Sequence, residues 1–530
     1  MKILLVSMPD TILPFKWAEG WVPHLGISSI AGNLDRKRFT VRLLDLVIRP
    51  YGVRNTVKRA VEELRPHVVG LTAMSFQYRM ASRIARLVKS IDSSIITVLG
   101  GYHATLAEDV ISTDRYAGFV DFLVRGEGEA TVRELLETID SEGRNFSGIP
   151  GVSFKDAGMF VHNPSRPLLD LRDVALPDRE TRLLGYKDGW NGMIDCVETS
   201  RGCTMSCNFC SIRGMYGRNF RVYSIDRIIE DIRRVKRLGA RRVFFTDDNI
   251  TLDVERFKSL CVALVENQVN DLRYSVQAST IGIARNPELA PLMREANFTL
   301  VYLGIDGLRD AQLQFMKKGR VQHDSVRAVE LLLGNGIQVM GGFIAGLPDD
   351  AAQDIRDIFR FIKDHSIAAP IVWGCTPYPR TQLREDLLRE GLIVNKDDYS
   401  AYNGWNTLVR TRHMSRRRVG YERTRGYLGF LVRTFIRGDN YYIRQLRSQS
   451  FWRMARARIA ALWYFLHAPA GTWQSTHGCS FHPWWQYPFL PLVWLWHRIA
   501  SVRRCIATWI GASSRTAPAR DRPGALARSE

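Results

Sequence analysis

Apolar runs and amphipathic stretches alternate along the first 140 residues of the chain. Residues 79–90, for example, place Met80, Ile84, Leu87 and Val88 at helical spacing. The apolar runs that we predict to be buried strands begin at Lys2, Thr40, His67, Ile95 and Phe119. Strands that alternate with helices predict a parallel α/β sheet of the Rossmann-like, flavodoxin-like kind, whose ligands bind beyond the carboxyl ends of the strands.

A second series of the same kind occupies residues 191–385. Its clearest helix has Ser224 as N-cap, carries an apolar face that starts at Ile225, and ends at Gly239. Six apolar runs, about 30 to 50 residues apart, begin at Met193, Arg242, Leu272, Leu300, Ile337 and Ile371. One strand and one helix per unit predict a partial (β/α)6 barrel of the TIM type, with its chemistry at the carboxyl ends of the strands.

The two α/β series define two predicted domains, residues 1–140 and 191–385, and the remaining residues form three further segments. Residues 141–190 hold several Gly and Pro and are predicted to be a linker or a small subdomain. Residues 386–512 are predicted to be a mainly helical, Arg/Trp-rich domain, with helical patterns at 416–437 and 451–465. Residues 513–530, which end in APARDRPGALARSE, are predicted to be a disordered tail.

The overall composition is that of a folded protein. A length of 530 residues, with 45% hydrophobic and 24% charged residues, excludes wholesale disorder, collagen and a polytopic membrane protein. Eight Cys are too sparse for a disulfide scaffold, and the opening MKILLVSMPD lacks the features of a signal peptide. No apolar run reaches the ~20 residues that a membrane-spanning helix needs. We therefore expect a cytoplasmic protein.

The net charge of +20 is concentrated at one end of the chain. Residues 401–530 hold 21 Arg, no Lys and four acidic residues, together with nine of the 13 Trp. Three interpretations stay open: a helical cap over the barrel mouth, a peripheral contact with the inner face of the membrane, and nucleic-acid binding. The membrane contact is supported by Arg453, Arg456 and Arg458, which lie close to Trp452 and Trp463, and by the later aromatic run HPWWQYPFLPLVWLW. The absence of a recognised nucleic-acid module disfavours nucleic acid.

The strongest local signal is a set of three cysteines, Cys203, Cys207 and Cys210. They follow Gly202 on a loop at the end of the first predicted barrel strand, so the three thiolates can turn toward one centre. A [4Fe-4S] cluster held by three cysteines leaves one iron open to another ligand. A structural zinc site would need a fourth Cys or His. The nearest one, Cys196, lies inside a predicted strand, where a buried apolar role is expected.

The spacing Cys-x3-Cys-x2-Cys after the first strand of a partial barrel resembles the radical S-adenosylmethionine (SAM) superfamily. That resemblance implies that the open iron binds SAM, whose reductive cleavage yields a 5'-deoxyadenosyl radical. It also implies cofactor-binding roles for Phe209 and Ile344 beside the adenine, for Thr246, Asp247 and Asp248 at the methionine amino group, and for Gln277, Ser279 and Asp306 at strand ends. Thr376–Thr381 resembles the family's TPxPGT motif, with Arg380 in place of Gly.

Some of these residues have simpler interpretations. Gln277, Ser279 and Asp306 are residue types that also serve as strand-end caps and turn residues. Asp247 and Asp248 are harder to explain in that way, because two adjacent acids at a strand end are costly without a cationic partner.

The first 140 residues resemble the cobalamin-binding domain of the B12-dependent radical SAM class, on the motifs LGGYHAT and VRGEGE. The resemblance implies that cobalamin is bound by Thr72, Ser75, Gly100, Gly101, His103, Thr105, Gly126 and Glu127. The chain has no DxHxxG motif, so no histidine is expected on the cobalt. Two alternatives remain: the glycine pair simply forms a tight turn, or the domain has lost cobalamin.

The combined resemblance implies an enzyme that uses a [4Fe-4S] cluster, SAM and cobalamin. We predict C-methylation of an unactivated carbon of a small metabolite through the 5'-deoxyadenosyl radical and methylcobalamin. Lipophilic metabolites are among the candidate substrates. The alternative is an oxidative cyclase or ring-rearranging enzyme of tetrapyrrole or natural-product biosynthesis. A non-catalytic cobalamin- or membrane-binding protein is disfavoured, because a binder needs no cluster with an open iron. The family implies flavodoxin or ferredoxin as the electron donor.

Overall fold

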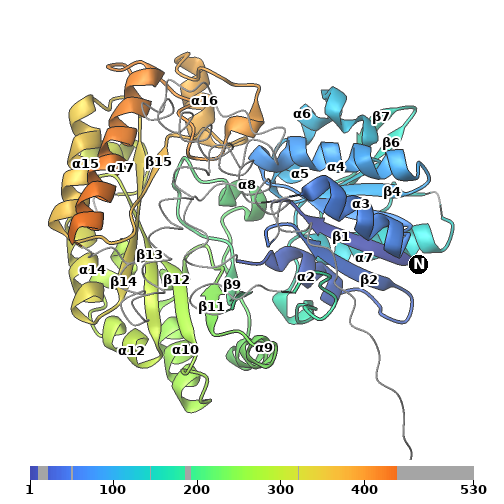
Figure 1. Cartoon of the computed structure of the whole chain (residues 1–530), viewed down its shortest axis with the longest axis horizontal. Coiled ribbons are helices and arrows are strands. Elements are labelled where there is room, and N and C mark those ends of the chain that lie inside the picture. Colours follow the sequence, from blue (N-terminus) through green and yellow to red (C-terminus); the bar gives the residue numbers. More distant parts are fainter. Residues whose placement is uncertain (10–21, 49–51, 144, 186–192, 320–321, 438–530) are drawn as a thin grey trace, which may run out of the picture.

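Two mainly parallel sheets, each covered by helices, make up most of the described part of the protein (Figure 1). The structure is a computed structural model and describes residues 1–9, 22–48, 52–143, 145–185, 193–319 and 322–437. In the order in which the strands pair, the first sheet contains β2 (Thr40–Asp45), β1 (Lys2–Ser7), β3 (Val68–Thr72), β4 (Ile96–Gly100), β5 (Phe122–Val124), β6 (Val152–Asp156) and β7 (Met159–His162). The order 2-1-3-4-5 of the parallel strands is that of flavodoxin-like folds, which confirms the predicted fold of this domain.

The parallel strands of the first sheet, β1 to β5, are largely buried, as their apolar runs predicted. Along β1, Leu4 and Val6 face one core, and Ile3 and Leu5 face the other. The helices that cover the two faces are α2 (Leu25–Gly32), α3 (Val53–Leu64), α4 (Tyr78–Ile91) and α7 (Gly128–Asp140). The predicted strand at Phe119 begins later, because residues 115–119 form a short 3-10 helix before β5.

Part of the segment 141–190 belongs to the first sheet. The expected linker or small subdomain contributes β6 and β7, a hairpin that pairs antiparallel with β5. The hairpin turns at Ala157 and Gly158, whose positive φ values of 46° and 84° are those of a two-residue turn that follows the twist of the strands. Farther on, Arg182 forms a parallel bridge to Leu43 of β2. The segment therefore runs from the β7 edge of the first sheet to its β2 edge before the second sheet begins.

The second sheet is parallel throughout and curls into an open half-barrel. Its order is β15 (Ile371–Gly374), β14 (Gln338–Ala345), β13 (Phe298–Asp306), β12 (Arg273–Ser279), β11 (Arg242–Phe245) and β8 (Ile194–Val197). Each strand coincides with one of the six predicted runs, and in the described residues β8 and β15 are the two edges. This confirms the partial barrel. The helices that follow the strands are α9 (Ile225–Arg237), α10 (Val254–Glu266), α11 (Thr280–Ala284), α12 (Leu289–Glu295), α13 (Asp310–Phe315), α14 (Gln322–Gly334), α15 (Ala352–Asp364) and α16 (Gln382–Arg389).

Short elements complete the fold, and several lie where the two sheets face each other. They are α5 (Tyr102–Leu106), α6 (Glu108–Thr113), α8 (Ile212–Tyr216), β9 (Ser200–Arg201), β10 (Arg221–Val222), and the 3-10 helices Ser75–Gln77, Arg115–Phe119, Leu171–Asp173, Ile250–Leu252 and Tyr399–Ala401. β9 and β10 pair antiparallel beside the end of β8. α5 of the first domain packs against α8 of the barrel domain.

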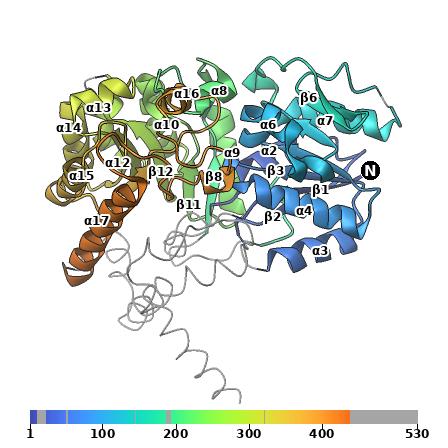
Figure 2. The same ribbon diagram turned by 90° about the horizontal axis from the view of Figure 1, so that it is seen from above.

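The last described helix, α17 (Arg416–Arg437), spans the residues predicted for it. It packs along α15 on the outer side of the barrel (Figures 1 and 2). Gly426 allows this close approach, because a Cβ there would lie 2.1 Å from the ring of Phe359. Within the described residues, no helix is long and apolar enough to cross a membrane. The helical pattern at 451–465, the rest of the predicted helical domain and the predicted tail at 513–530 lie outside the described residues.

Candidate active site between the two sheets

A cavity of ≈ 330 Å³ lies where the carboxyl ends of the first sheet face the barrel domain. From the first domain it is lined by the ends of β3, β4 and β5 and by the start of α2. From the barrel domain it is lined by Glu198, Ser200, Arg201, Met215, Tyr216, Thr246 and Asp248. Both domains therefore present the ends at which α/β sheets bind ligands to the same space.

Five of the eight residues predicted to bind cobalamin line this cavity: Thr72, Gly100, Gly101, Gly126 and Glu127. Gly101 has φ 91° and ψ −169°, a conformation that is essentially restricted to glycine. A Cβ there would lie 2.7 Å from Thr72 Oγ1 and 3.0 Å from the Ala73 backbone. The glycine pair thus makes a tight turn and also keeps the cavity wall free of side chains, which fits the close approach of a large cofactor.

The other three predicted residues do not line the cavity. Ser75 is buried in the 3-10 helix Ser75–Gln77. The Thr105 hydroxyl donates to Gly101 O (3.0 Å) and accepts from Gly126 N (2.9 Å), so it ties two cavity loops together. His103 is fully buried between the rings of Tyr78 and Tyr399, with centroid distances of 4.5 and 5.2 Å. Burial lowers the pKa of His103 to about 3, so its ring stays neutral.

The three cysteines lie on the loop between β9 and α8. Asn208 anchors this loop: its N–H donates to Met316 O (3.1 Å), its side-chain amide donates to Phe315 O (2.8 Å), and its carbonyl accepts from Leu383 N (3.0 Å). The thiols of Cys203, Cys207 and Cys210 are half-buried. The loop is therefore held against α13 and α16 with its sulfurs partly accessible.

The donor set of this loop is suited to a cluster. Burial raises the pKa of Cys207 to about 11 and of Cys210 to about 12, and the neighbouring thiols add to both shifts. A metal must therefore displace protons when it binds here. Among the described residues, no three His, Cys, Asp or Glu side chains converge as ligands of a single ion. In a four-iron cluster each cysteine binds a different iron, so the three thiols fit a cluster better than zinc.

Of the two adjacent acids, Asp248 is the one that lines the cavity. Its carboxylate accepts a hydrogen bond from Gly202 N (3.1 Å), one residue before Cys203, and burial raises its pKa to about 7. Thr246 lines the same wall. Asp247 is buried instead and accepts hydrogen bonds from Thr199 N (3.2 Å), Thr199 Oγ1 (2.6 Å) and the Ser200 hydroxyl. The structure thus places Asp248 toward the cavity and Asp247 in the wall behind it.

The remaining predicted SAM-binding residues have local partners. Gln277 donates to Asp247 O (3.2 Å), and the Ser279 hydroxyl caps α11. Asp306 has φ 64° and forms an ion pair with Lys318, whose charge acts on the pKa of Cys207. Phe209 packs on the same apolar cluster as Ile344, next to the cysteine loop. Neither of these two side chains lines the cavity.

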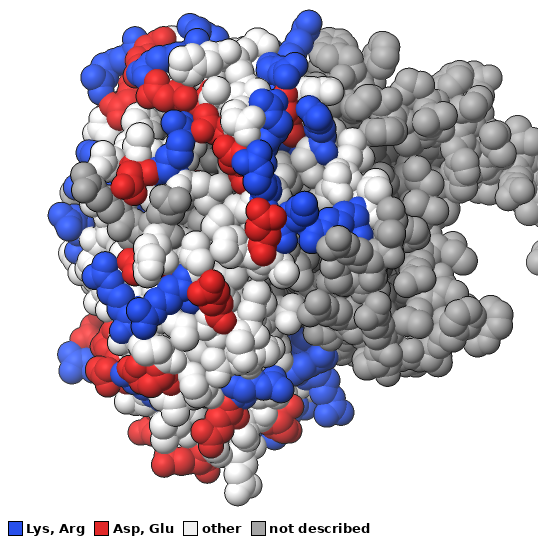
Figure 3. All heavy atoms as spheres, turned by 90° about the vertical axis from the view of Figure 1, so that its left-hand side faces the viewer, with Lys and Arg blue, Asp and Glu red and all other residues white. Residues whose placement is uncertain are grey.

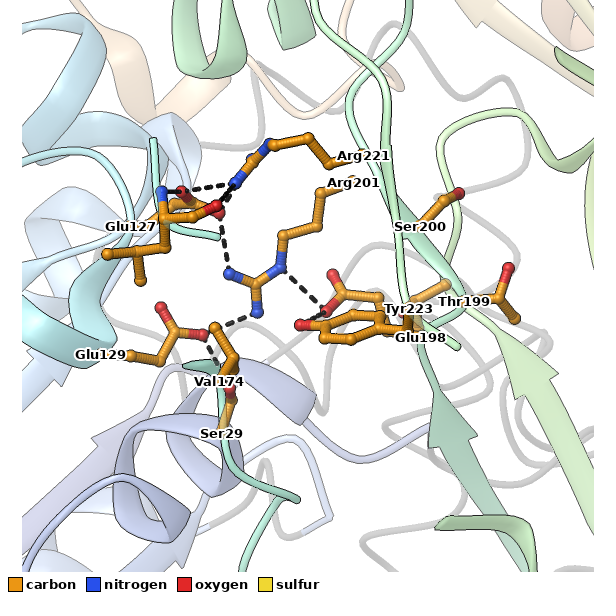
Figure 4. Close-up of polar contacts among 12 residues, drawn as sticks. Ser29, Glu127, Glu129, Val174, Glu198, Thr199, Ser200, Arg201, Arg221 and Tyr223 are labelled. Atoms are coloured by element: carbon orange, nitrogen blue, oxygen red, sulfur yellow. Dashed lines mark hydrogen bonds and ion pairs between the residues drawn. The ribbon is translucent and has the colours of Figure 1, made fainter. Parts of the chain in front are cut away.

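Sequence reasoning missed two arginines that join the domains. Arg201 forms ion pairs with Glu127, Glu129 and Glu198 (Figure 4). Its only signal in the sequence is its place two residues before Cys203. Arg380, in the glycine position of the TPxPGT-like motif, has φ 56°. It donates to Thr105 O (3.2 Å) and forms an ion pair with Glu108 (2.5 Å), so the departure from the motif supplies a contact with the first domain.

Two known families match separate parts of this chain. Residues 17–136 match the B12 binding domain, and residues 197–362 match the radical SAM superfamily. The chain is 28% identical to the "Uncharacterized methyltransferase PH0819" of Pyrococcus horikoshii, over 82% of this chain and 93% of that protein. It is 26% identical to the anaerobic magnesium-protoporphyrin IX monomethyl ester cyclase of Rubrivivax gelatinosus, over 76% of this chain and 71% of the cyclase.

A solved structure shares the arrangement of the two sheets. The cobalamin-dependent S-adenosylmethionine radical enzyme OxsB, solved with aqua-cobalamin and S-adenosylmethionine bound, matches with a TM-score of 0.67 and 17% identity. The match covers 89% of this chain and 72% of OxsB. At this level of identity the likeness supports the fold.

Proposed function

Because the chain is a radical SAM protein with a B12-binding domain, we propose that it is an enzyme that methylates an unactivated carbon of a small molecule. Its cofactors would be a [4Fe-4S] cluster, SAM and cobalamin. The observation that carries this proposal is the shared cavity, whose wall includes Gly101 from one domain and Asp248 from the other. A methyl donor and a radical generator must reach the same substrate carbon, and this arrangement gives both of them access to one space.

The residues of the chain would divide the work of holding the cofactors. Cys203, Cys207 and Cys210 would hold the cluster, and the loops at Thr72, Gly100–Gly101 and Gly126 would hold cobalamin. When bound, these cofactors supply radical and methyl-transfer chemistry that side chains lack, while the protein supplies position and electrostatics. Asp248 would accept hydrogen bonds from the ammonium group of SAM.

The apolar part of the cavity supports a substrate with hydrophobic character. Its walls include Leu71, Val98, Val124 and Leu135, which exclude water from the space that the cofactors would share. We propose a small, lipophilic substrate, with flavodoxin or ferredoxin as the electron donor.

The second candidate is oxidative cyclisation, which the similarity to the magnesium-protoporphyrin cyclase favours. The test is anaerobic reconstitution with iron, sulfide and hydroxocobalamin, followed by dithionite and SAM with a deuterated methyl group. 5'-Deoxyadenosine together with S-adenosylhomocysteine and labelled methylcobalamin is expected for a methyltransferase. 5'-Deoxyadenosine alone would favour the cyclase, and failure to retain cobalamin would refute the methylation proposal.

We further propose that the α15/α17 face contacts an anionic membrane surface, with the protein otherwise cytoplasmic. A groove of ≈ 320 Å³ runs between the two helices, on the face shown in Figure 3. Its lining combines the rings of Phe359 and Phe430 with one acid, Glu422, and five cations: Arg356, Arg360, Lys363, Arg425 and Arg433. Bases beside aromatic rings are the composition that binds anionic interfaces.

Vesicle co-sedimentation tests this contact in the full chain. The double variant Arg425→Glu/Arg433→Glu should bind phosphatidylglycerol vesicles several-fold more weakly than the unmodified chain. The matched control is Arg233→Glu/Arg237→Glu on α9, which changes the charge by the same amount elsewhere and should leave binding unchanged. Equal losses in both variants would show that net charge alone is responsible.

A further inference from the structure

Arg201 lies at the junction of the two halves of the candidate site. It is the last residue of β9, two residues before Cys203, and its side chain is 7% exposed. It also lines the shared cavity. One buried side chain thus borders both the cysteine loop and the cavity.

The guanidinium of Arg201 binds three carboxylates with its three nitrogens (Figure 4). Nη1 lies 2.8 Å from Glu127 Oε1, Nη2 lies 2.6 Å from Glu129 Oε1, and Nε lies 2.9 Å from Glu198 Oε2. Glu127 ends the loop after β5 and Glu129 lies in the first turn of α7, both in the first domain, whereas Glu198 follows β8 in the barrel domain. This planar fork of donors cannot be reproduced by a lysine, which is a point charge.

Other contacts fix the two glutamates of the first domain. Glu127 also binds Arg221 of β10 (3.0 Å) and accepts from Leu169 N (2.8 Å). Glu129 accepts from the Ser29 hydroxyl (2.7 Å). Glu129 is also held within the first domain by Ser29, and Glu127 is also held by Arg221 of the barrel domain, so any movement of the loop after β5 is passed to Arg201 and its neighbour on β10.

The network is electrostatically dependent on Arg201. Burial by itself raises the pKa of Glu129, yet the charge and hydrogen bond of Arg201 bring that pKa below its ordinary value. For Glu198, burial outweighs the same arginine and the pKa is raised. Pulling the loop after β5 away from the cysteine loop would separate Glu127 and Glu129 from Arg201, the cation that they share with Glu198. Leaving buried carboxylates without that partner is costly, so the two loops cannot separate freely.

We propose that Arg201 is a positioning residue that couples the two cofactor sites, so that filling the cavity with cobalamin and building the cluster on the cysteine loop favour each other. The inference rests on the proposed binding of both cofactors. A ligand that fixes the β5 loop lowers the conformational freedom of Arg201, and therefore of the neighbouring Cys203. Such coupling is reciprocal by thermodynamic necessity and usually amounts to about five- to 150-fold in affinity.

Arg179 provides a matched control. It is equally buried, with its side chain 1% exposed, and binds two carboxylates, Asp231 (2.6 Å) and Asp195 (3.5 Å). It joins the segment after the first sheet to the barrel domain but does not line the cavity. Arg179→Lys should therefore weaken the packing of the two parts without reaching either cofactor site.

The experiment measures the dissociation constant of hydroxocobalamin anaerobically, in the full chain with and without a reconstituted cluster. The unmodified chain and Arg179→Lys should bind cobalamin at least about fivefold more tightly when the cluster is present. Arg201→Lys should reduce this ratio to within twofold of one. The electron paramagnetic resonance signal of the reduced cluster, recorded with and without cobalamin, should change in the unmodified chain and not in Arg201→Lys.

A second variant guards against misfolding. If Arg201→Lys fails to fold, Glu129→Gln removes one carboxylate of the fork while keeping its shape, and it should lower the ratio by a smaller factor. A ratio of one in the unmodified chain, or an unchanged ratio in the folded variants, would overturn the coupling while leaving the proposed function intact. Absence of cobalamin binding in every form would instead refute the proposed function, and the coupling with it.

Discussion

The turn at Gly101 offers a direct test of the cobalamin-binding wall. Gly101→Ala would place a Cβ 2.7 Å from Thr72 Oγ1 and 3.0 Å from backbone atoms of Ala73. Real Cβ atoms essentially never come as close as 2.7 Å to another heavy atom, and the backbone atoms at 3.0 Å leave little room to adjust, so the β3 and β4 loops must move apart. The backbone of Gly101, at φ 91° and ψ −169°, is also strained for any residue with a side chain.

The magnitude follows from these two costs. Strain in this backbone region costs about 1–3 kcal/mol, and overpacking costs about 1–3 kcal/mol. A total near 3 kcal/mol corresponds to a fall of about 6–12 °C in the unfolding temperature of a domain of this size. Because the moved loops line the cavity, the dissociation constant of hydroxocobalamin should also rise by about tenfold or more, which is ~1.4 kcal/mol of binding.

Gly126→Ala is the matched control for Gly101→Ala. Gly126 also has a positive φ, 74°, and lines the same cavity, but a Cβ there has nothing within 4 Å. It should cost only the left-handed strain, about 1 kcal/mol or 2–4 °C. Thermal unfolding of the cofactor-free chain, followed by circular dichroism, measures both variants. If Gly126→Ala proved as damaging as Gly101→Ala, the steric argument would be wrong.

Three further variants test the rest of the site. Cys207→Ser should prevent cluster assembly, measured by iron content and visible absorbance, while Cys261→Ser, at a buried site in α10, should not; cluster in both would contradict the assignment. Burial raises the pKa of Asp248 from 3.8 to about 7, so the folded chain retains a proton that the unfolded chain releases. The contribution of Asp248 to stability is therefore full below about pH 4 and is lost as the pH rises to 7. Between pH 4 and 8, the free energy of unfolding of Asp248→Asn in urea should rise relative to that of the unmodified chain by up to about 4 kcal/mol. Equal pH profiles of the two chains would refute this. Arg380→Ala and Arg380→Gly both lose the ion pair with Glu108, but only alanine is strained at the positive φ of 56°. Arg380→Ala should therefore be less stable than Arg380→Gly by about 1 kcal/mol; the reverse order would show that the backbone is unstrained.

The strands were predictable because burial on both faces leaves a run of apolar residues. This holds for β1, where five of six residues are buried, and for β14 of the half-barrel, where six of eight are buried. β7 was not predictable by that rule, because it is an exposed edge strand whose residues are polar or solvent-facing. The hairpin that it forms with β6 was therefore expected to be part of a linker.

The cysteine loop was predictable because its chemistry depends on near neighbours in the sequence. The partners of the other candidate residues were not, because a pattern shows which residue type ends a strand and not what it meets. Asp247 and Asp248 are adjacent and chemically identical, yet one is fixed inside the wall by Thr199 and Ser200 and the other faces the cavity. Their contacts with residues 199–202 of the same domain distinguish them.

Buried charge holds part of the boundary between the domains, beside ring contacts such as that of His103 with Tyr399, and the buried charge has a consequence for function. An apolar interface adheres at least as firmly, because burying ions carries a desolvation cost that apolar side chains avoid. However, apolar surfaces tolerate sliding, whereas Arg201 can satisfy its three carboxylates in one geometry only. In the proposed reaction two reactive cofactors meet over one carbon, so they need a fixed separation more than they need strong adhesion. The ion network at Arg201 supplies that separation at the point where the cysteine loop and the cavity meet.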